Sequence, residues 1–137
     1  MAYGNLLTDV VQSSTTNTPP VFKDGNGTET GQLCRAWVNF GYISSAISVR
    51  GSFNVSSVTR GATGRYTVNF TNAMPDATYA TTIGGWNNGN GNGAWVSVGT
   101  GTGSYPAGLS TTSVSITSYN YAGSDQDQDA IFLSVFR

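Results

Sequence analysis

Three aspartates alternate near the C-terminal end of the sequence, in the stretch SDQDQDA. An extended backbone would place the carboxylates of Asp125, Asp127 and Asp129 on one side of the chain, where hard oxygen ligands could hold Ca²⁺. The stretch has no central glycine and no glutamate further on, so it does not continue as a calcium-binding loop. A solvated acidic strand edge explains the same residues, and we favour it over calcium binding. We therefore predict no metal ion and no other cofactor.

Tryptophans and asparagines near the middle of the chain could bind a sugar. In the stretch GGWNNGNGNGAWVSVG, Trp86 and Trp95 stand on either side of an Asn-Gly tract. An indole can stack on a pyranose ring, and the carboxamides of Asn88 and Asn90 donate and accept hydrogen bonds as sugar hydroxyls do. Tyr105 would join them if its loop, GTGTGSYPAG, shares an end of the fold. We predict that these five residues bind ligand; the alternative is that both tryptophans are core or interface residues and the tract is a spacer.

The residues needed for common catalytic sites are scarce. The sequence has no histidine, which excludes a Ser-His-Asp triad, a Cys-His dyad and a His-based zinc site. The single cysteine, Cys34, falls at an apolar-facing strand position, where we expect a small buried hydrophobic residue rather than a nucleophile. A glycosidase needs two carboxylates placed across a sugar. Three of the seven acidic residues, Asp9, Asp24 and Glu29, lie in the unpatterned N-terminal stretch, so we predict that the protein is not an enzyme.

The composition argues against nucleic acid and membrane partners. Charged residues make up only 9 % of the chain and the net charge is −1, so the surface has little field to attract a polyanion or an anionic lipid. Aromatic residues make up 12 %, which is not typical of a disordered chain. No basic region followed by an apolar run marks a signal peptide, and no apolar stretch approaches the roughly 20 residues that cross a bilayer. We expect assembly in a cytoplasm.

The elements that would position these residues are strands. In RYTVNF, apolar residues alternate with polar ones, as in a half-buried strand. CRAWVNF has the same period, with Cys34, Ala36, Val38 and Phe40 on one face and Arg35, Trp37 and Asn39 on the other. In AISVRGSF the same pattern would place Ile47, Val49 and Phe53 on one face. The stretch SVTRGATGRYTV predicts a hairpin in which Gly61 and Gly64 supply positive φ. Further strands are expected at residues 78–83, 94–98, 112–121 and 130–136.

This spacing of short strands and turns favours an all-β fold, because no segment carries a helical stripe. A chain of 137 residues is long enough for one core. We predict an antiparallel β-sandwich, jelly-roll-like, of about eight strands, in a head domain of residues 33–137. Residues 1–32 lack periodicity and contain Pro19-Pro20, so we predict an extended N-terminal arm, with a short strand possible at residues 6–11.

The last expected strand, DAIFLSVFR, is apolar on both faces. Phe132 and Phe136 point away from the face that carries Ile131 and Leu133. One interpretation is a central strand inside a closed sandwich. The other is that the second face packs against another subunit, together with Trp37, which lies opposite the apolar face of its own strand. The second interpretation predicts an interface of Trp37, Phe132 and Phe136.

Two stretches resemble a known family. LCRAWVNF, followed by SFNVSSVTRGATGRYTVNFTNAMPDATY, is similar to the distal domain at the C-terminus of tailed-bacteriophage tail fibre proteins. The match spans about Leu33 to Tyr79, with a weaker echo in the closing FLSVFR. From about residue 80 to residue 129 no family motif is present. Family members commonly carry a long shaft before this domain, whereas about thirty residues precede it here.

The resemblance implies a homotrimeric, non-enzymatic virion protein that contacts the host surface. On this basis we expect a tail-fibre-type head that recognises a host receptor, a glycan or a protein, without covalent chemistry. Residues 1–32 would bind other virion proteins. The alternative is a decoration or cement trimer on the capsid or tail, with a purely structural role.

Overall fold

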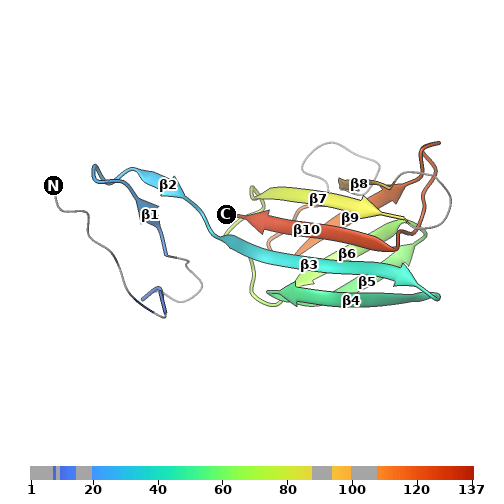
Figure 1. Ribbon diagram of the computed structural model, residues 1–137, viewed down its shortest axis with the longest axis horizontal. Helices are drawn as coiled ribbons and strands as arrows, with labels where there is room; N and C mark the ends of the chain where they lie inside the picture. The colour runs from blue at the N-terminus through green and yellow to red at the C-terminus, as the bar shows by residue number, and fades with distance from the viewer. Residues whose placement is uncertain (1–7, 9, 15–19, 88–93, 100–107) are drawn as a thin grey trace. The chain divides into compact units, whose positions relative to one another are not determined.

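The computed structural model describes residues 8, 10–14, 20–87, 94–99 and 108–137, and the regular elements within these ranges are all β-strands (Figure 1). The chain divides into two compact units, residues 1–33 and 34–137. The strands are β1 (Phe22–Lys23), β2 (Glu29–Gly31), β3 (Cys34–Ile43), β4 (Ala46–Phe53), β5 (Val55–Ala62), β6 (Arg65–Phe70), β7 (Ala80–Trp86), β8 (Trp95–Val98), β9 (Ser113–Tyr119) and β10 (Ala130–Phe136). Across these ranges no helix is long and apolar enough to span a membrane.

The first unit contains a short antiparallel hairpin of β1 and β2. Its turn is organised by Asp24, whose Oδ1 accepts hydrogen bonds from the backbone N–H groups of Asn26 and Thr28, both at 2.9 Å. Gly27 in this turn has a φ of 83°, which glycine adopts at low cost. The strand considered at residues 6–11 is not found at Thr8, Val10 or Val11; its other positions lie outside the described residues.

The second unit, which we call the head, is a β-sandwich, as the sequence predicted. Sheet I has the order β4-β3-β10-β7 and sheet II the order β5-β6-β9-β8, and their neighbouring strands pair antiparallel. Figure 1 shows the two layers, with sheet I nearer the viewer. The eight strands match the expected number. Strand β10 has the predicted bounds, whereas β7 runs three residues beyond the predicted 78–83 and reaches Trp86.

The core lies between the sheets and is built from the alternating apolar residues. Sheet I contributes Ala36, Val38, Phe40, Ile131, Leu133 and Val135, and sheet II contributes Tyr66, Val68, Phe70, Val114 and Ile116. Two edge-to-face ring pairs cross this core: Phe40–Tyr66 at 5.3 Å and Phe70–Tyr79 at 6.0 Å between centroids. Full burial of each large apolar side chain stabilises the fold by roughly 1.5–3 kcal/mol.

A β-bulge in β4 overturns one prediction. Phe40 pairs with Val49 but its neighbour Asn39 pairs with Gly51, so Arg50 is the extra residue. Because side chains alternate with period two, one extra residue moves all that follow to the other face. Phe53 therefore pairs with Trp37 on the outer face of sheet I, not on the face of Ile47 as the alternation predicted.

Two further local expectations change. Gly64 has a φ of 65° in the β5–β6 turn, as predicted, but Gly61 lies within β5 and is not among the glycines with positive φ. Cys34 is half-buried and outside the core cluster, because a second register shift pairs it with Phe136 rather than with a core position.

The ends of the strands divide the head into two regions. At the terminal end, Cys34 begins β3 beside Phe136, where β10 stops. At the opposite end, which we call the loop end, lie the β3–β4 turn, the β5–β6 turn, the last residue of β7 and the segment 120–129. The chain thus comes into the head at the end where β10 stops, and Asn54 and residues 71–79, which join β4 to β5 and β6 to β7, lie at that end too.

Candidate functional site

The loop end is held together by the segment 120–129, which contacts both sheets. The backbone N–H of Tyr42 in β3 donates to the carbonyl of Gln128 at 2.9 Å, and the N–H of Gln126 donates to the carbonyl of Ser118 in β9 at 3.0 Å. The Asn87 carboxamide, directly after β7, donates to the carbonyl of Asp127 at 3.4 Å. The position of Asn87, which precedes the Asn-Gly tract, is therefore fixed by this segment.

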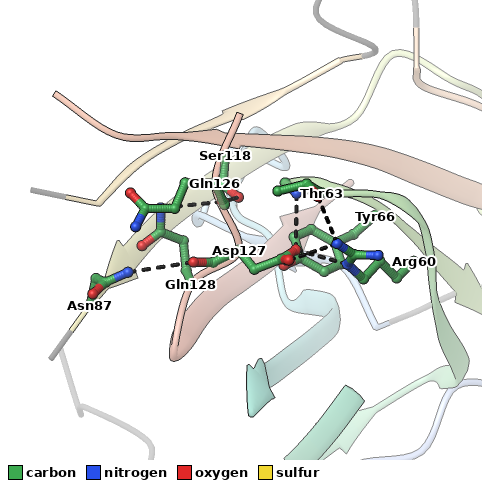
Figure 2. Close-up of polar contacts among 9 residues, drawn as sticks. Arg60, Thr63, Tyr66, Asn87, Ser118, Gln126, Asp127 and Gln128 are labelled. Carbon is green, nitrogen blue, oxygen red and sulfur yellow. Dashed lines mark hydrogen bonds and ion pairs between the residues drawn. The ribbon is translucent and has the colours of Figure 1, made fainter. Parts of the chain in front are cut away.

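Asp127 is the centre of this arrangement, as Figure 2 shows. Its Oδ1 accepts hydrogen bonds from the Tyr66 hydroxyl at 2.6 Å and from the Gly64 N–H at 2.9 Å. The guanidinium of Arg60 donates to both carboxylate oxygens, from Nε at 2.9 Å and from an η nitrogen at 2.7 Å. The bidentate geometry fixes the orientation as well as the strength of this pair. One carboxylate thus joins the segment 120–129 to the β5–β6 hairpin.

The ionisation of the groups in this cluster follows from burial and hydrogen bonding. Burial alone would raise the pKa of Asp127, but the hydrogen bonds from Arg60, Tyr66 and Gly64 outweigh it and leave the pKa below its ordinary value. Burial, followed by the hydrogen bond to Asp127, raises the pKa of Tyr66. The hydrogen bond to Asp127 also raises the pKa of Arg60, whose guanidinium lies 4.4 Å from the ring centroid of Tyr42. At neutral pH the pair is fully charged.

Two of the three alternating aspartates, Asp125 and Asp127, prove to be ion-pair partners rather than parts of a solvated acidic edge. Asp125 binds Arg65 at 2.8 Å and Asp127 binds Arg60 at 2.7 Å, on neighbouring strands. The segment forms only an isolated bridge at Asp125 and is not a strand, so the carboxylates do not line up on one side. Among the residues that the structure describes, no three acidic, histidine or cysteine side chains gather as a metal site.

Two glutamines of the same segment carry buried oxygen atoms without a hydrogen-bond partner: Oε1 of Gln126 and Oε1 of Gln128. Gln128 is fully buried, and its amide N–H donates to the carbonyl of Tyr119 at 3.2 Å. Ser118 donates its hydroxyl to the carbonyl of Gln126 at 2.6 Å. The burial of these amides cannot be predicted from the sequence, because polar residues in a segment without periodicity give no sign of burial.

The two tryptophans of the predicted ligand site are both exposed, Trp86 at 54 % and Trp95 at 65 %. Neither belongs to the core of the chain. Trp86 ends β7 on the outer face of sheet I, opposite Ala130, whereas Trp95 begins β8 on the outer face of sheet II, opposite Tyr119. Val96, which follows Trp95, packs against the core. The indoles therefore lie near the loop end on opposite faces of the sandwich.

The other three predicted ligand residues, Asn88, Asn90 and Tyr105, lie outside the described residues. The residues that flank the segment of Tyr105 are described: Gly99 donates its N–H to Ser115 at 2.8 Å, and Gly108 accepts from the same residue at 2.7 Å. Both flanks lie at the end of β8 away from Trp95. The Asn-Gly tract and the Tyr105 segment thus leave β8 from opposite ends.

The outer face of sheet I carries the predicted interface residues. Trp37 is 42 % exposed and Phe132 is 47 % exposed, while Phe136 is half-buried. The Trp37 indole lies over Gly51, where an added Cβ would be 3.3 Å from two ring carbons. Phe53 adds a further exposed ring opposite Trp37. Aromatic side chains thus lie on this face among small and polar residues such as Thr82 and Ser134, and Trp86 is one of them.

The outer face of sheet II is polar. Pairing across the strands sets hydroxyl and amide side chains side by side in rows: Thr59, Thr67 and Ser115 in one row, and Ser57, Asn69 and Ser113 in the next. The Asn69 amide donates to the Ser57 hydroxyl at 3.0 Å. The two outer faces of one sandwich therefore present different chemistry, aromatic on sheet I and hydroxyl-rich on sheet II.

Comparison of the chain with protein-family models, with curated proteins and with solved structures found no significant match.

Proposed function

We propose that the protein is a trimeric virion head of the tail-fibre type, which recognises a receptor on the host surface without covalent chemistry. The observation that carries this proposal is the contrast between the two outer faces of the sandwich. An aromatic face is suited to association with copies of the chain, and a polar face with an exposed indole is suited to binding at the surface. The resemblance of residues 33–79 to tail-fibre domains supports the same function.

The proposed trimer interface is the outer face of sheet I, with Trp37, Phe132 and Phe136. Exposed aromatic residues that are contiguous on one face are unusual for a monomer in water. Phe53, brought to this face by the bulge in β4, enlarges it beyond the three residues predicted. Most oligomers of one chain are symmetric, so the same face would be buried in each copy.

Sedimentation equilibrium of the purified protein tests the trimer. We expect a species of three times the 14.3 kDa chain mass, and we expect Trp37→Glu to give monomer at micromolar concentration. Trp95→Glu is the matched control, because it places the same charge at an exposed tryptophan of the other sheet and should leave the trimer intact. A monomeric wild-type protein, or a Trp37→Glu variant that stays trimeric, would contradict the proposed interface.

Receptor recognition is tested on cells. The fluorescently labelled trimer, added to a panel of bacterial strains and measured by flow cytometry, should stain some strains and not others. Mild periodate oxidation of the cells, which cleaves the vicinal diols of sugars, should abolish staining if the receptor is a glycan. Staining that survives periodate but is lost after protease treatment would identify a protein receptor instead.

The alternative function, a decoration or cement trimer, makes a different prediction. Such a protein would lie on the capsid or tail shell in a cryo-EM map of the virion and would stain no strain. A position at the tip of a fibre together with strain-selective staining would support the receptor-binding function.

A further inference from the structure

We propose that the outer face of sheet II binds a neutral pyranose-containing glycan, with Trp95 as the stacking platform and the Arg65–Asp125 pair as its polar neighbour. This inference rests on the proposed receptor-binding function and assigns it a site and a ligand class. It assigns Trp95 to the ligand site and leaves Trp86 out of it, although the sequence predicted that both tryptophans bind ligand.

Strand pairing determines which residues share this face with Trp95. The first row at the loop end contains Trp95, Tyr119 and Asp125, since Tyr119 pairs with Trp95 on one side and forms a bridge to Asp125 on the other. The next row contains Ser97, Thr117 and Arg65. Residues two apart on a strand are roughly 7 Å apart, so adjacent rows are within the span of one or two sugar rings.

The face is hollowed next to these rows. A depression of about 170 Å³ is lined by Gly61, Arg65, Tyr66, Thr67, Gly99, Ser115, Ile116 and Thr117. No heavy atom lies within 4 Å of a Cβ built at Gly61, so the absence of a side chain keeps that side open. Thr67 and Ser115 are half-buried, whereas the hydroxyl of Thr117 donates to the carbonyl of Gly99 at 2.8 Å. The depression thus offers the Thr67 and Ser115 hydroxyls two rows along the same face from the exposed indole of Trp95.

The charges on this face favour a neutral ligand. Arg65 donates to Asp125 from Nε at 2.9 Å, and the pair keeps about a third of each side chain exposed. A guanidinium and a carboxylate held together by two hydrogen bonds present fixed donors and acceptors to the hydroxyls of a sugar, as a charge-assisted pair does. Because the two charges cancel, the site has no excess positive charge to recruit a sialic or uronic acid.

Trp86 is in different surroundings. It lies on the outer face of sheet I, in the row next to Phe132 and Gly84, and that face is the proposed subunit interface. A second depression on this face is lined by Thr82, Ile83, Gly84, Phe132 and Ser134, without a charged side chain. The aromatic character of this face fits burial against another copy better than binding of a hydrated sugar.

The experiment uses an array of purified bacterial polysaccharides, neutral and acidic, probed with the full-length trimer and its variants. We expect the wild-type protein to bind neutral polysaccharides, and we expect Trp95→Ala and Thr67→Val each to weaken binding at least tenfold at unchanged melting temperature. Trp95→Phe, which keeps an aromatic ring, should retain part of the binding. Phe22→Ala, at an exposed aromatic residue of the first unit, is the matched control and should bind as the wild type does. Trp86→Ala lies on the proposed subunit interface, so it is tested once sedimentation has shown it to be trimeric, and it should then bind as the wild type does.

The possible outcomes separate this site from the function on which it rests. Binding that is lost in Trp86→Ala and kept in Trp95→Ala would overturn the site and leave receptor recognition standing. Binding to acidic polysaccharides alone would overturn the ligand class. Staining of cells without binding to any polysaccharide would overturn the glycan proposal but not the receptor-binding function. Failure to bind either cells or polysaccharides would overturn both.

Discussion

Gly85 of β7 packs directly against the Cγ2 methyl group of Val96 in β8, with no room for a β-carbon between them. β7 is the edge strand of sheet I and β8 the edge strand of sheet II, so this contact closes the sandwich on one side. The residues beside the contact are the two exposed tryptophans, Trp86 and Trp95. The close approach of the sheets at Gly85 therefore sets the position of the indoles on either face.

Gly85→Ala should separate these edges. The added methyl group meets the side chain of Val96 and the Cβ of Ala94, so we expect a loss of about 1–3 kcal/mol in the free energy of unfolding, as for other overpacked sites. Gly84→Ala is the control, because no heavy atom lies within 4 Å of a Cβ at Gly84, and it should change stability by less than about 0.5 kcal/mol. Urea unfolding measures both; equal losses would contradict this account of the edge.

The hydrogen bond between Tyr66 and Asp127 should be measurable by a double-mutant cycle. Tyr66→Phe removes the donor at 2.6 Å and should cost about 1–2 kcal/mol of unfolding free energy. In the Asp127→Ala background the same change should cost much less, since the acceptor is gone. Tyr79→Phe is the control, because the Tyr79 hydroxyl donates to the carbonyls of Ser110 and Ser113, and it should show no coupling to Asp127. If Tyr66→Phe and Tyr79→Phe showed equal coupling energies with Asp127→Ala, the coupling would not come from the Tyr66–Asp127 hydrogen bond.

Acid should destabilise the head through two carboxylates. Hydrogen bonds from Arg137 and then Thr78 lower the pKa of Asp76 to about 2, and the pKa of Asp127 also lies below its ordinary value of 3.8. A carboxyl group whose pKa is lower in the folded than in the unfolded protein stabilises the fold at pH values above its unfolded-state pKa. This stabilisation is lost as the pH falls through the folded-state pKa. We therefore expect stability to fall between about pH 4 and pH 2. Asp76→Asn should make the free energy of unfolding depend less on pH. Urea unfolding at several pH values measures this, and a pH dependence as steep as that of the wild type would contradict the assignment.

Asn54 turns the chain from sheet I to sheet II, and two substitutions separate its contributions. Its φ is 56°, its Nδ2 donates to the carbonyls of Arg35 and Asn72, and its Oδ1 accepts from the Asn72 N–H at 2.7 Å. Asn54→Gly keeps the backbone conformation and loses the hydrogen bonds, so we expect a cost of about 1–2 kcal/mol. Asn54→Ala adds about 1 kcal/mol of left-handed strain. Thermal unfolding compares the two, and an alanine variant as stable as the glycine variant would show that strain is absent.

Removal of residues 1–32 tests the proposed attachment arm. We expect the truncated protein to fold and to remain trimeric, because the head has its own core, but to fail to incorporate into particles. Circular dichroism and sedimentation check the first expectation, and an incorporation assay with the parental virion checks the second. A truncated chain that does not fold would place the first residues within the folding unit of the head.

The prediction of the sandwich from sequence succeeded where alternation was uninterrupted. Ala36, Val38 and Phe40 are buried and Trp37 is exposed, as the period of two requires. It failed at Phe53, because a bulge is one residue inserted opposite a partner strand and leaves no mark in the sequence of its own strand.

The candidate site was predictable only in part. The exposure of Trp95 follows from the local sequence AWVSV, because side chains alternate along a strand and the apolar neighbours of Trp95 occupy the inner face. The pairing of Arg60 with Asp127 joins residues 67 positions apart, and the division of Trp86 and Trp95 between the two faces depends on which sheet each strand joins. Such relations arise from topology, which hydrophobic periodicity does not specify. The sequence gives one sign of the ion pairs: two arginines lie close together in RGATGR, and aspartates alternate in SDQDQD.

The position of Cys34 beside Phe136 at one end of sheet I has a consequence for how such a head can diversify. A unit whose first and last strands begin and end side by side can be inserted into another protein with both junctions at one place. Genetic exchange at this end would then transfer the sandwich as one piece. Substitutions at the loop end would change the surface there without changing the junctions.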